Sequence, residues 1–283
     1  MKNAGTVLRK LMAENKYLIA PCAFDALSAK AIETSGFKVA GTTGQGLHGT
    51  IIGQPDNGLL AFNEMVSACG KIADAVNIPS LCDAEGGYGN ALNTMRTVRE
   101  FERAGVAGIF IEDQKLPPNC PFIKEAETIS IEQMCGKIRA AVDAKQDKDF
   151  IIVARTDAPF SEAVERAQAY IEAGADLIKP IPKSMKELEL WPQKVRAPLH
   201  VGFMSNVNAG VTARDIGQMG YKFITFPLNM LYMYAKTCLR YLETVKRDET
   251  DAPLAAEFMD FMEYQKFIGM DEYVANQTKY VFD

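Results

Sequence analysis

The sequence lacks the features typical of nucleic-acid-binding and membrane-spanning proteins. Its 31 basic and 36 acidic residues give a net charge of −5, and no run of Lys and Arg predicts a nucleic-acid partner. No long apolar stretch predicts a membrane span, and the opening MKNAGTVLRKLMAENK contains no apolar signal core. We therefore expect a cytoplasmic protein without a nucleic-acid or membrane partner.

Closely paired cysteines are missing as well. The chain has six cysteines and no C-x-x-C pair: Cys22, Cys69, Cys82, Cys120, Cys135 and Cys238. Their scatter argues against a zinc site and against a secreted disulfide scaffold. Most are expected to be ordinary buried side chains in a reducing compartment.

Apolar residues are abundant, at 48% of the 283 residues, which is enough for a large core. Strand-like runs alternate with helical patterns along the chain. Strands are expected at 17–22, 37–41, 78–82, 107–111, 150–154, 176–178, 198–203 and 223–226. Helices are expected at 25–35, 62–75, 92–104, 130–144, 161–173, 185–191, 212–219 and 228–245. Eight strand–helix units predict a parallel (β/α)₈ barrel, a fold of about 250 residues; an open doubly wound sheet is the alternative.

The C-terminal segment is expected to be an addition to this barrel. We predict a single barrel domain over 1–283, with 253–283 as a C-terminal helical extension. The extension is rich in large apolar residues: Phe258, Met259, Phe261, Met262, Phe267 and Met270. Such a tail predicts a helix that packs on another subunit, swapped between subunits, or one that caps its own barrel.

Acidic residues follow three consecutive expected strands. They are Asp83 and Glu85 after the third strand, Glu112 and Asp113 after the fourth, and Asp157, with Arg155, after the fifth. The second strand ends at Thr42, Thr43 and Gly44, and Asp56 lies in the loop beyond them. The carboxyl ends of barrel strands meet at one mouth, so these side chains are expected to face one cavity. So many carboxylates repel one another without a cation, and oxygen ligands suit Mg²⁺.

Residues 83–90, DAEGGYGN, resemble the D-A-D-x-G-Y-G-N signature of the isocitrate lyase/phosphoenolpyruvate mutase superfamily. Four other segments match in order and spacing: PCAFDALSAK (21–30), GQPDNG (53–58), FERAGVAGIFIEDQ (101–114) and ARTDA (154–158). The chain is identified as a member of this superfamily, which includes methylisocitrate and dimethylmalate lyases, oxaloacetate decarboxylases and phosphonomutases. The resemblance implies a (β/α)₈ barrel and chemistry through a pyruvate enolate or a related anion.

The resemblance also implies roles for individual residues. Asp83 matches the direct metal ligand; Asp56, Glu85 and Glu112 match acids that hold the metal and its waters; Arg155, Thr43 and Gly44 match groups that bind the substrate carboxylate. The implied cofactor is Mg²⁺, for which Mn²⁺ can substitute.

The loop after the fourth strand, which distinguishes subfamilies, departs from the family pattern. Lyases carry K-R-C-G-H there, whereas this chain reads EDQKLPPNCPF (112–122). Cys120 aligns with the lyase cysteine, the supposed proton donor, but the cations around that cysteine are replaced and Lys115 is displaced. Cys120 is therefore either a retained proton donor or a small residue in a loop with another purpose.

Three more residues have open roles. Lys179, at the end of the sixth strand, can bind a second carboxylate or, as the weaker alternative, form a Schiff base. His200, in the middle of a strand, is more typical of a core histidine than of a catalyst. His48 either lines the mouth or lies at the surface.

These features predict a Mg²⁺-dependent lyase that cleaves a C–C bond, by aldol-type cleavage or decarboxylation, in a small 2-hydroxy or 2-oxo di- or tricarboxylate. Arg155, Cys120 and Glu112 are the expected catalytic residues. One alternative is a phosphonomutase or another enzyme of P–C bonds, and a second is a non-catalytic carboxylate-binding homologue. A homotetramer is expected from the apolar tail and the family.

Overall fold

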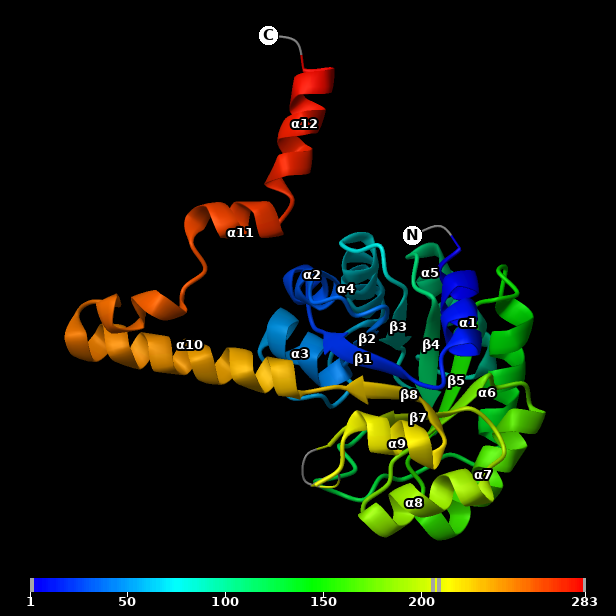
Figure 1. Ribbon diagram of the computed structural model, residues 1–283. Helices are drawn as coiled ribbons and strands as arrows, with labels where there is room; N and C mark the ends of the chain where they lie inside the picture. The colour runs from blue at the N-terminus through cyan, green and yellow to red at the C-terminus, as the bar shows by residue number, and fades with distance from the viewer. Residues whose placement is uncertain (1–2, 205–206, 208–209, 282–283) are drawn as a thin grey trace. The chain divides into compact units, whose positions relative to one another are not determined.

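The structure is a computed structural model that describes residues 3–204, 207 and 210–281. Eight parallel strands form a closed barrel in sequence order, as the central arrows of Figure 1 show. The strands are β1 (Leu18–Ala23), β2 (Ala40–Thr42), β3 (Ser80–Asp83), β4 (Gly108–Glu112), β5 (Ile151–Thr156), β6 (Leu177–Pro180), β7 (Leu199–Gly202) and β8 (Tyr221–Phe226). Because β8 pairs with β1, with Leu18 opposite Phe223, the sheet has no free edge. The predicted (β/α)₈ barrel is confirmed and the open sheet is excluded.

Helices surround the strands. In the barrel unit they are α1 (Ala4–Glu14), α2 (Ala26–Thr34), α3 (Gly44–Ile52), α4 (Phe62–Asp74), α5 (Ala91–Arg103), α6 (Ile131–Ala144), α7 (Phe160–Glu172), α8 (Met185–Lys194) and α9 (Ala213–Met219). Most of their starts follow from capping chemistry. For example, Asp25, Asn90 and Ser130 each accept a backbone N–H bond from the first turn of the helix that follows.

Two of these helices are absent from the sequence-based expectation. Helix α1 was not expected, and α3 arises from GQGLHGTII, whose glycines read as a loop. Helix α1 packs its buried Leu8 into one core cluster with Leu81, Ile151 and Phe223 of the strands. It thereby fills the amino-terminal end of the barrel, so the opposite end remains for chemistry.

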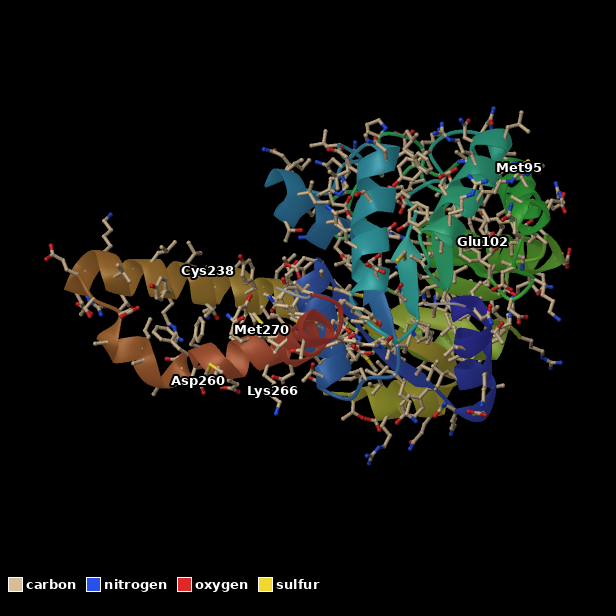
Figure 2. The ribbon with its side chains drawn as sticks, turned by 90° about the horizontal axis from the view of Figure 1, so that it is seen from above. Met95, Glu102, Cys238, Asp260, Lys266 and Met270 are labelled. Atoms are coloured by element: carbon tan, nitrogen blue, oxygen red, sulfur yellow. The ribbon has the colours of Figure 1, made fainter. Side chains whose placement is uncertain are left out.

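The chain divides into two compact units, Met1–Leu228 and Asn229–Asp283. The second unit contains α10 (Asn229–Asp248), the 3₁₀ helix η1 (Ala252–Glu257), α11 (Phe261–Phe267) and α12 (Met270–Tyr280). Figure 2 labels Cys238 on α10, Lys266 on α11 and Met270 at the start of α12. This division groups helix α10 with the segment after residue 253. Among the residues described in the second unit, only Thr244 is buried.

Membrane-spanning helices are not present among the described residues. None of these helices, including the long α10, combines the length and the apolar composition that a bilayer crossing requires.

Candidate active site

Three neighbouring strands place charged side chains side by side at the carboxyl end of the barrel. The strand register sets Glu112 of β4 opposite Arg155 of β5, and Arg155 opposite Lys179 of β6. Residues in register on parallel strands point to the same face of the sheet. Asp83 ends the adjacent β3. The barrel therefore collects acids and cations in one row at its mouth.

Asp83 is held by backbone and hydroxyl groups on both sides. Its N–H donates to Thr42 Oγ1 at 2.9 Å, and its Oδ1 accepts the Glu85 N–H at 2.9 Å. Its Oδ2 accepts the Gly44 N–H at 3.1 Å. The Gly44 N–H, expected to serve a substrate carboxylate, is thus used here to orient Asp83, while Thr43 occupies the N-cap position of α3 without a side-chain capping bond.

The carboxylates of Asp56 and Asp83 meet at Gly44. A Cβ atom at Gly44 would lie 2.6 Å from Asp56 Oδ2 and 3.0 Å from Asp83 Oδ2. Only glycine leaves room for the two oxygens at this point. The loop after α3 therefore brings Asp56 to the end of β3, as the sequence predicts.

Glu85 completes the acidic group. Its backbone has a φ of 50°, in the left-handed region that side chains other than glycine rarely adopt. The turn buries the side chain, and Glu85 Oε1 has no hydrogen-bond partner among the described residues. An orphaned buried carboxylate oxygen is a donor atom that a cation would satisfy.

The electrostatics of the acids favour a bound cation. Burial and the neighbouring Asp83 raise the pKa of Asp56 to about 6 and hold that of Glu85 well above its ordinary value. Burial also raises the pKa of Glu112 to about 8, against the opposite effect of Arg155. A divalent cation would let these acids ionise together, and its preferred ligands are carboxylate oxygens. The residues present fit a Mg²⁺ ion.

Arg155 links the acids of two strands. Its Nη1 lies 3.0 Å from Glu112 Oε2, and its Nη2 donates to Asp157 Oδ1 at 2.8 Å. These neighbours raise the pKa of Arg155 although burial lowers it, so the guanidinium is charged. Its Nε has no partner among the described residues and is therefore a spare donor.

Asp113 does not face the mouth, contrary to the sequence-based expectation. Its Oδ2 accepts bonds from Thr156 Oγ1 at 2.8 Å, Tyr170 Oη at 2.7 Å and Arg166 Nη1 at 3.4 Å. Tyr170 and Arg166 belong to α7, outside the barrel. Because successive side chains of a strand alternate between faces, Glu112 pointing inward sends Asp113 outward. Asp113 also accepts the Asp157 N–H at 3.0 Å and so supports the strand end that carries Arg155.

Lys179 lies beside the acids without a carboxylate partner. Its Nζ is 3.5 Å from the centroid of the Phe110 ring, and no ion pair joins it to a described acid. Burial, with the nearby charge of Arg155, lowers the pKa of Lys179 to about 8. The ammonium is thus held by an aromatic face and leaves its donors for an anion.

His200 lies in the barrel interior, as expected for a core residue. Its ring packs edge-on against Phe110 and Phe223, and its Nε2 lies 3.1 Å from Thr225 Oγ1. Burial and the charge of Lys179 lower the pKa of His200 well below the ordinary value, so the imidazole is neutral.

The loop after β4 is closed at its base by backbone pairing. Gln114 and Thr128 form an antiparallel bridge, and the Lys115 N–H donates to the Glu127 carbonyl at 2.7 Å. The Lys115 ammonium pairs with exposed Glu127 at 3.4 Å. This ion pair holds Lys115 at the surface, and the other lysine of the loop, Lys124, is exposed as well.

Cys120 is not brought into contact with the acids. It is half-buried, its carbonyl accepts the N–H groups of Ile123 and Lys124, and its thiol has no hydrogen bond to a described charged side chain. The loop does pack against the loop of Asp56, because a Cβ at Gly58 would lie 2.8 Å from Pro118 Cδ. The two loops therefore meet near the mouth.

Two residues at this site have roles that the sequence did not reveal. Lys137 of α6 donates from Nζ to the Gly86 carbonyl at 2.8 Å and so braces the turn after Glu85. His48 of α3 lies with Asp56 and Glu85 in a group whose ligand atoms are all within 4.8 Å of one another. His48 is fully buried, not at the surface. No sequence motif signals either role, because both depend on how the helices pack.

Comparisons with known proteins agree with this arrangement. The chain matches the family described as phosphoenolpyruvate phosphomutase over residues 8–246. It is 36% identical over 280 residues to 2,3-dimethylmalate lyase of Eubacterium barkeri, which covers 95% of this chain and 96% of the relative. It is 35% identical over 283 residues to 2-methylisocitrate lyase of Aeropyrum pernix, which covers 96% and 90%.

A solved structure extends the likeness to three dimensions. Phosphonopyruvate hydrolase, in complex with oxalate and Mg²⁺, matches with a TM-score of 0.89 and 26% identity over 99% of this chain and 100% of that one. Sequence and fold agree over almost the whole length, and the chain therefore belongs to the isocitrate lyase/phosphoenolpyruvate mutase superfamily of enzymes.

Proposed function

We propose that this protein is a Mg²⁺-dependent lyase that cleaves a C–C bond in a small 2-hydroxy or 2-oxo di- or tricarboxylate. The observation that carries the proposal is the convergence of Asp56, Asp83, Glu85 and Glu112 beside two cations, Arg155 and Lys179. The acids suit a bound metal ion, and the two basic side chains beside them suit the carboxylates of a substrate. The relatives named as dimethylmalate and methylisocitrate lyases support this class of reaction.

The acids would hold the metal and its waters. Asp83 is the proposed direct ligand, because the hydrogen bonds to both of its oxygens fix its orientation. Asp56, Glu85 and Glu112 would hold the metal directly or through water, and Mn²⁺ would replace Mg²⁺. When bound, the metal would stabilise negative charge that develops on substrate oxygens as the bond breaks.

The cations would hold the substrate by its carboxylates. Arg155 has an Nε–H without a partner among the described residues, which is free for one carboxylate. Thr43 and Gly44, at the start of α3, are the other proposed substrate contacts, although the Gly44 N–H bonds Asp83 in this structure. Lys179 would bind a second carboxylate, for which its ammonium is available. Two anchors at neighbouring strand ends favour a di- or tricarboxylate over a monocarboxylate.

The proton that the leaving anion requires has two proposed sources in this chain. One is Glu112, whose pKa burial raises to about 8; it would donate only where it holds the metal through water and keeps its proton. Cys120 is the second source, and it would need the loop to bring its thiol to the substrate. Decarboxylation of an oxaloacetate-like acid would produce the same enolate without requiring that movement.

The first experiment is a screen for pyruvate release, coupled to lactate dehydrogenase, with Mg²⁺ present. The panel contains oxaloacetate, substituted malates, methylisocitrates and phosphonopyruvate, with glyoxylate measured separately for isocitrate. Release from one acid, lost with EDTA and in Asp83→Asn, is the expected result. Activity that survives both treatments would refute the proposal.

Other outcomes of this screen identify the alternative functions. Phosphonopyruvate as the only substrate would indicate P–C chemistry, which is disfavoured because both lysines of the loop are exposed, with Lys115 paired to Glu127. No turnover of any acid, with oxalate still bound, would indicate a carboxylate-binding homologue.

A further inference from the structure

His48 has both of its ring nitrogens engaged by protein groups. Its Nε2 lies 3.2 Å from the backbone nitrogens of both Leu59 and Leu60. Its Nδ1 lies 2.9 Å from the Gly44 carbonyl oxygen and 3.2 Å from Asp56 Oδ1. The ring is fully buried, and these groups are the hydrogen-bond and ion-pair partners of its two nitrogens.

These partners determine which nitrogen carries the proton. A backbone N–H is only a donor, so Nε2 must be the acceptor for Leu59 and Leu60. Nδ1 faces two acceptors, a carbonyl and a carboxylate, so Nδ1 must carry the hydrogen. The lone pair that would bind a metal is therefore already used, although His48 lies among possible ligand atoms.

The bonds of His48 join the two halves of the Asp56 loop to α3. Nδ1–H contacts the Asp56 carboxylate, while Nε2 holds the backbone where the loop enters α4. The other Asp56 oxygen is the one that approaches Gly44, 2.6 Å from where a Cβ would lie. One oxygen of Asp56 is thus anchored, and the second is aimed at Asp83 and the proposed metal position.

We infer that His48 is a positioning residue that orients Asp56 toward the metal through its Nδ1–H, and that it is not itself a metal ligand. This inference rests on the proposed function, because it assigns Asp56 to the metal site. Partners that orient metal ligands typically contribute about 10–100-fold to metal affinity.

Two conservative substitutions of His48 distinguish the role of Nδ1 from that of Nε2. In His48→Asn the amide nitrogen occupies the place of Nδ1 and can still donate to Asp56. In His48→Gln the amide oxygen reaches the place of Nε2 and can still accept from Leu59 and Leu60, but nothing donates to Asp56. Thermal melts of both variants show whether the fold is retained.

The measurement is Mg²⁺ binding to the metal-free protein by calorimetry, with Mn²⁺ as a second probe. We expect His48→Gln to weaken binding about 10–100-fold and His48→Asn to bind nearly as tightly as the wild type. In an Asp56→Asn background, His48→Gln should cause no further loss, because it acts through the absent carboxylate.

Three outcomes would overturn the inference. They are unchanged affinity in His48→Gln, an equal loss in both His48 variants, and a further loss from His48→Gln in the Asp56→Asn background. The last would identify His48 as a ligand. Failure of the wild-type protein to bind Mg²⁺ or Mn²⁺ at all would instead refute the proposed function, so the two failures are distinguishable.

Discussion

Lys179 is a cation that the barrel holds over an aromatic ring, and no ion pair joins it to a described acid. A group in this state loses its charge at a lower pH than a surface lysine, because burial and Arg155 disfavour the ammonium. Below pH 8 the side chain is charged and binds an anion. Above its pKa of about 8 it becomes a neutral amine.

We therefore predict that KM for the dicarboxylate substrate rises as the pH increases through about 8. Lys179→Met should raise KM about 10–100-fold at pH 7, since a hydrogen bond to a charged group contributes about 1.5–3 kcal/mol, and should remove this pH dependence. Lys179→Arg, which stays charged, should bind substrate above pH 8. Steady-state kinetics between pH 6.5 and 9 tests this, and a pH-independent KM in the wild type would contradict it.

His200 makes folding sensitive to acid. Folding lowers its pKa below the ordinary 6.5, so below that pH the unfolded chain binds more protons than the native protein. Its contribution to stability is complete above pH 6.5 and is lost as the pH falls toward the lowered pKa. The loss is at most about 1.4 kcal/mol per pH unit for one proton.

Comparison with His200→Phe isolates this effect from the titration of the buried acids. Phenylalanine keeps a ring between Phe110 and Phe223 but does not titrate. We expect the free energy of unfolding of the wild type, measured with urea, to fall more steeply than that of the variant between pH 7 and 5. Parallel curves would show that His200 is not buried in its neutral form.

At the scale of the element, helix α3 offers a matched pair of glycines. A methyl group at Gly44 would push against Asp56 and Asp83, whereas a Cβ at Gly49 meets nothing within 4 Å. Gly44→Ala should therefore abolish or strongly weaken Mg²⁺ binding while the protein stays folded. Gly49→Ala should leave binding unchanged and stabilise the helix by about 0.5–1 kcal/mol. Equal metal affinity in the two variants would contradict the convergence of acids at Gly44.

Elements with regular patterns were predictable, and those that depend on packing were not. The strands β3, β4 and β5 follow from short apolar runs that end in charge, and the acids at their ends identify the mouth. Helix α3 was missed because its glycines are unfavourable in a helix, whereas the structure holds it through the contacts of the buried His48.

At the level of single side chains, the alternation of a strand decides which acids face the mouth. Glu112 and Asp113 look equivalent in the sequence, yet only one can point inward. The bond from Lys137 to Gly86 joins residues far apart in the chain, so the sequence alone gave no sign of it. Whether Cys120 takes part in the reaction remains a prediction for kinetics to test.

At the scale of the whole molecule, the C-terminal unit exposes large apolar side chains. Seven of those described have between 60% and 73% of their surface exposed: Met233, Leu239, Leu242, Phe261, Met262, Tyr273 and Tyr280. Exposed apolar surface of this extent is typical of an interaction site. We propose that further copies of this chain cover it in a homotetramer.

Size-exclusion chromatography with light scattering should give about four times the mass of one chain. Replacing Phe261 and Met262 with Asp should produce smaller species. Leu92→Lys is the control, because Leu92 is 73% exposed but belongs to the barrel unit. A monomeric wild type would refute the proposed assembly.

The pairing at the base of the loop after β4 has a consequence for how this protein can diversify. Because Gln114 and Thr128 are joined there, the chain leaves and re-enters the scaffold at nearly one point. The intervening segment can change in length and composition without altering the path of β4 or α6. We expect that a loop transplanted from a relative would change the substrate preference and keep the barrel, if the contact of Pro118 with Gly58 of the Asp56 loop is preserved.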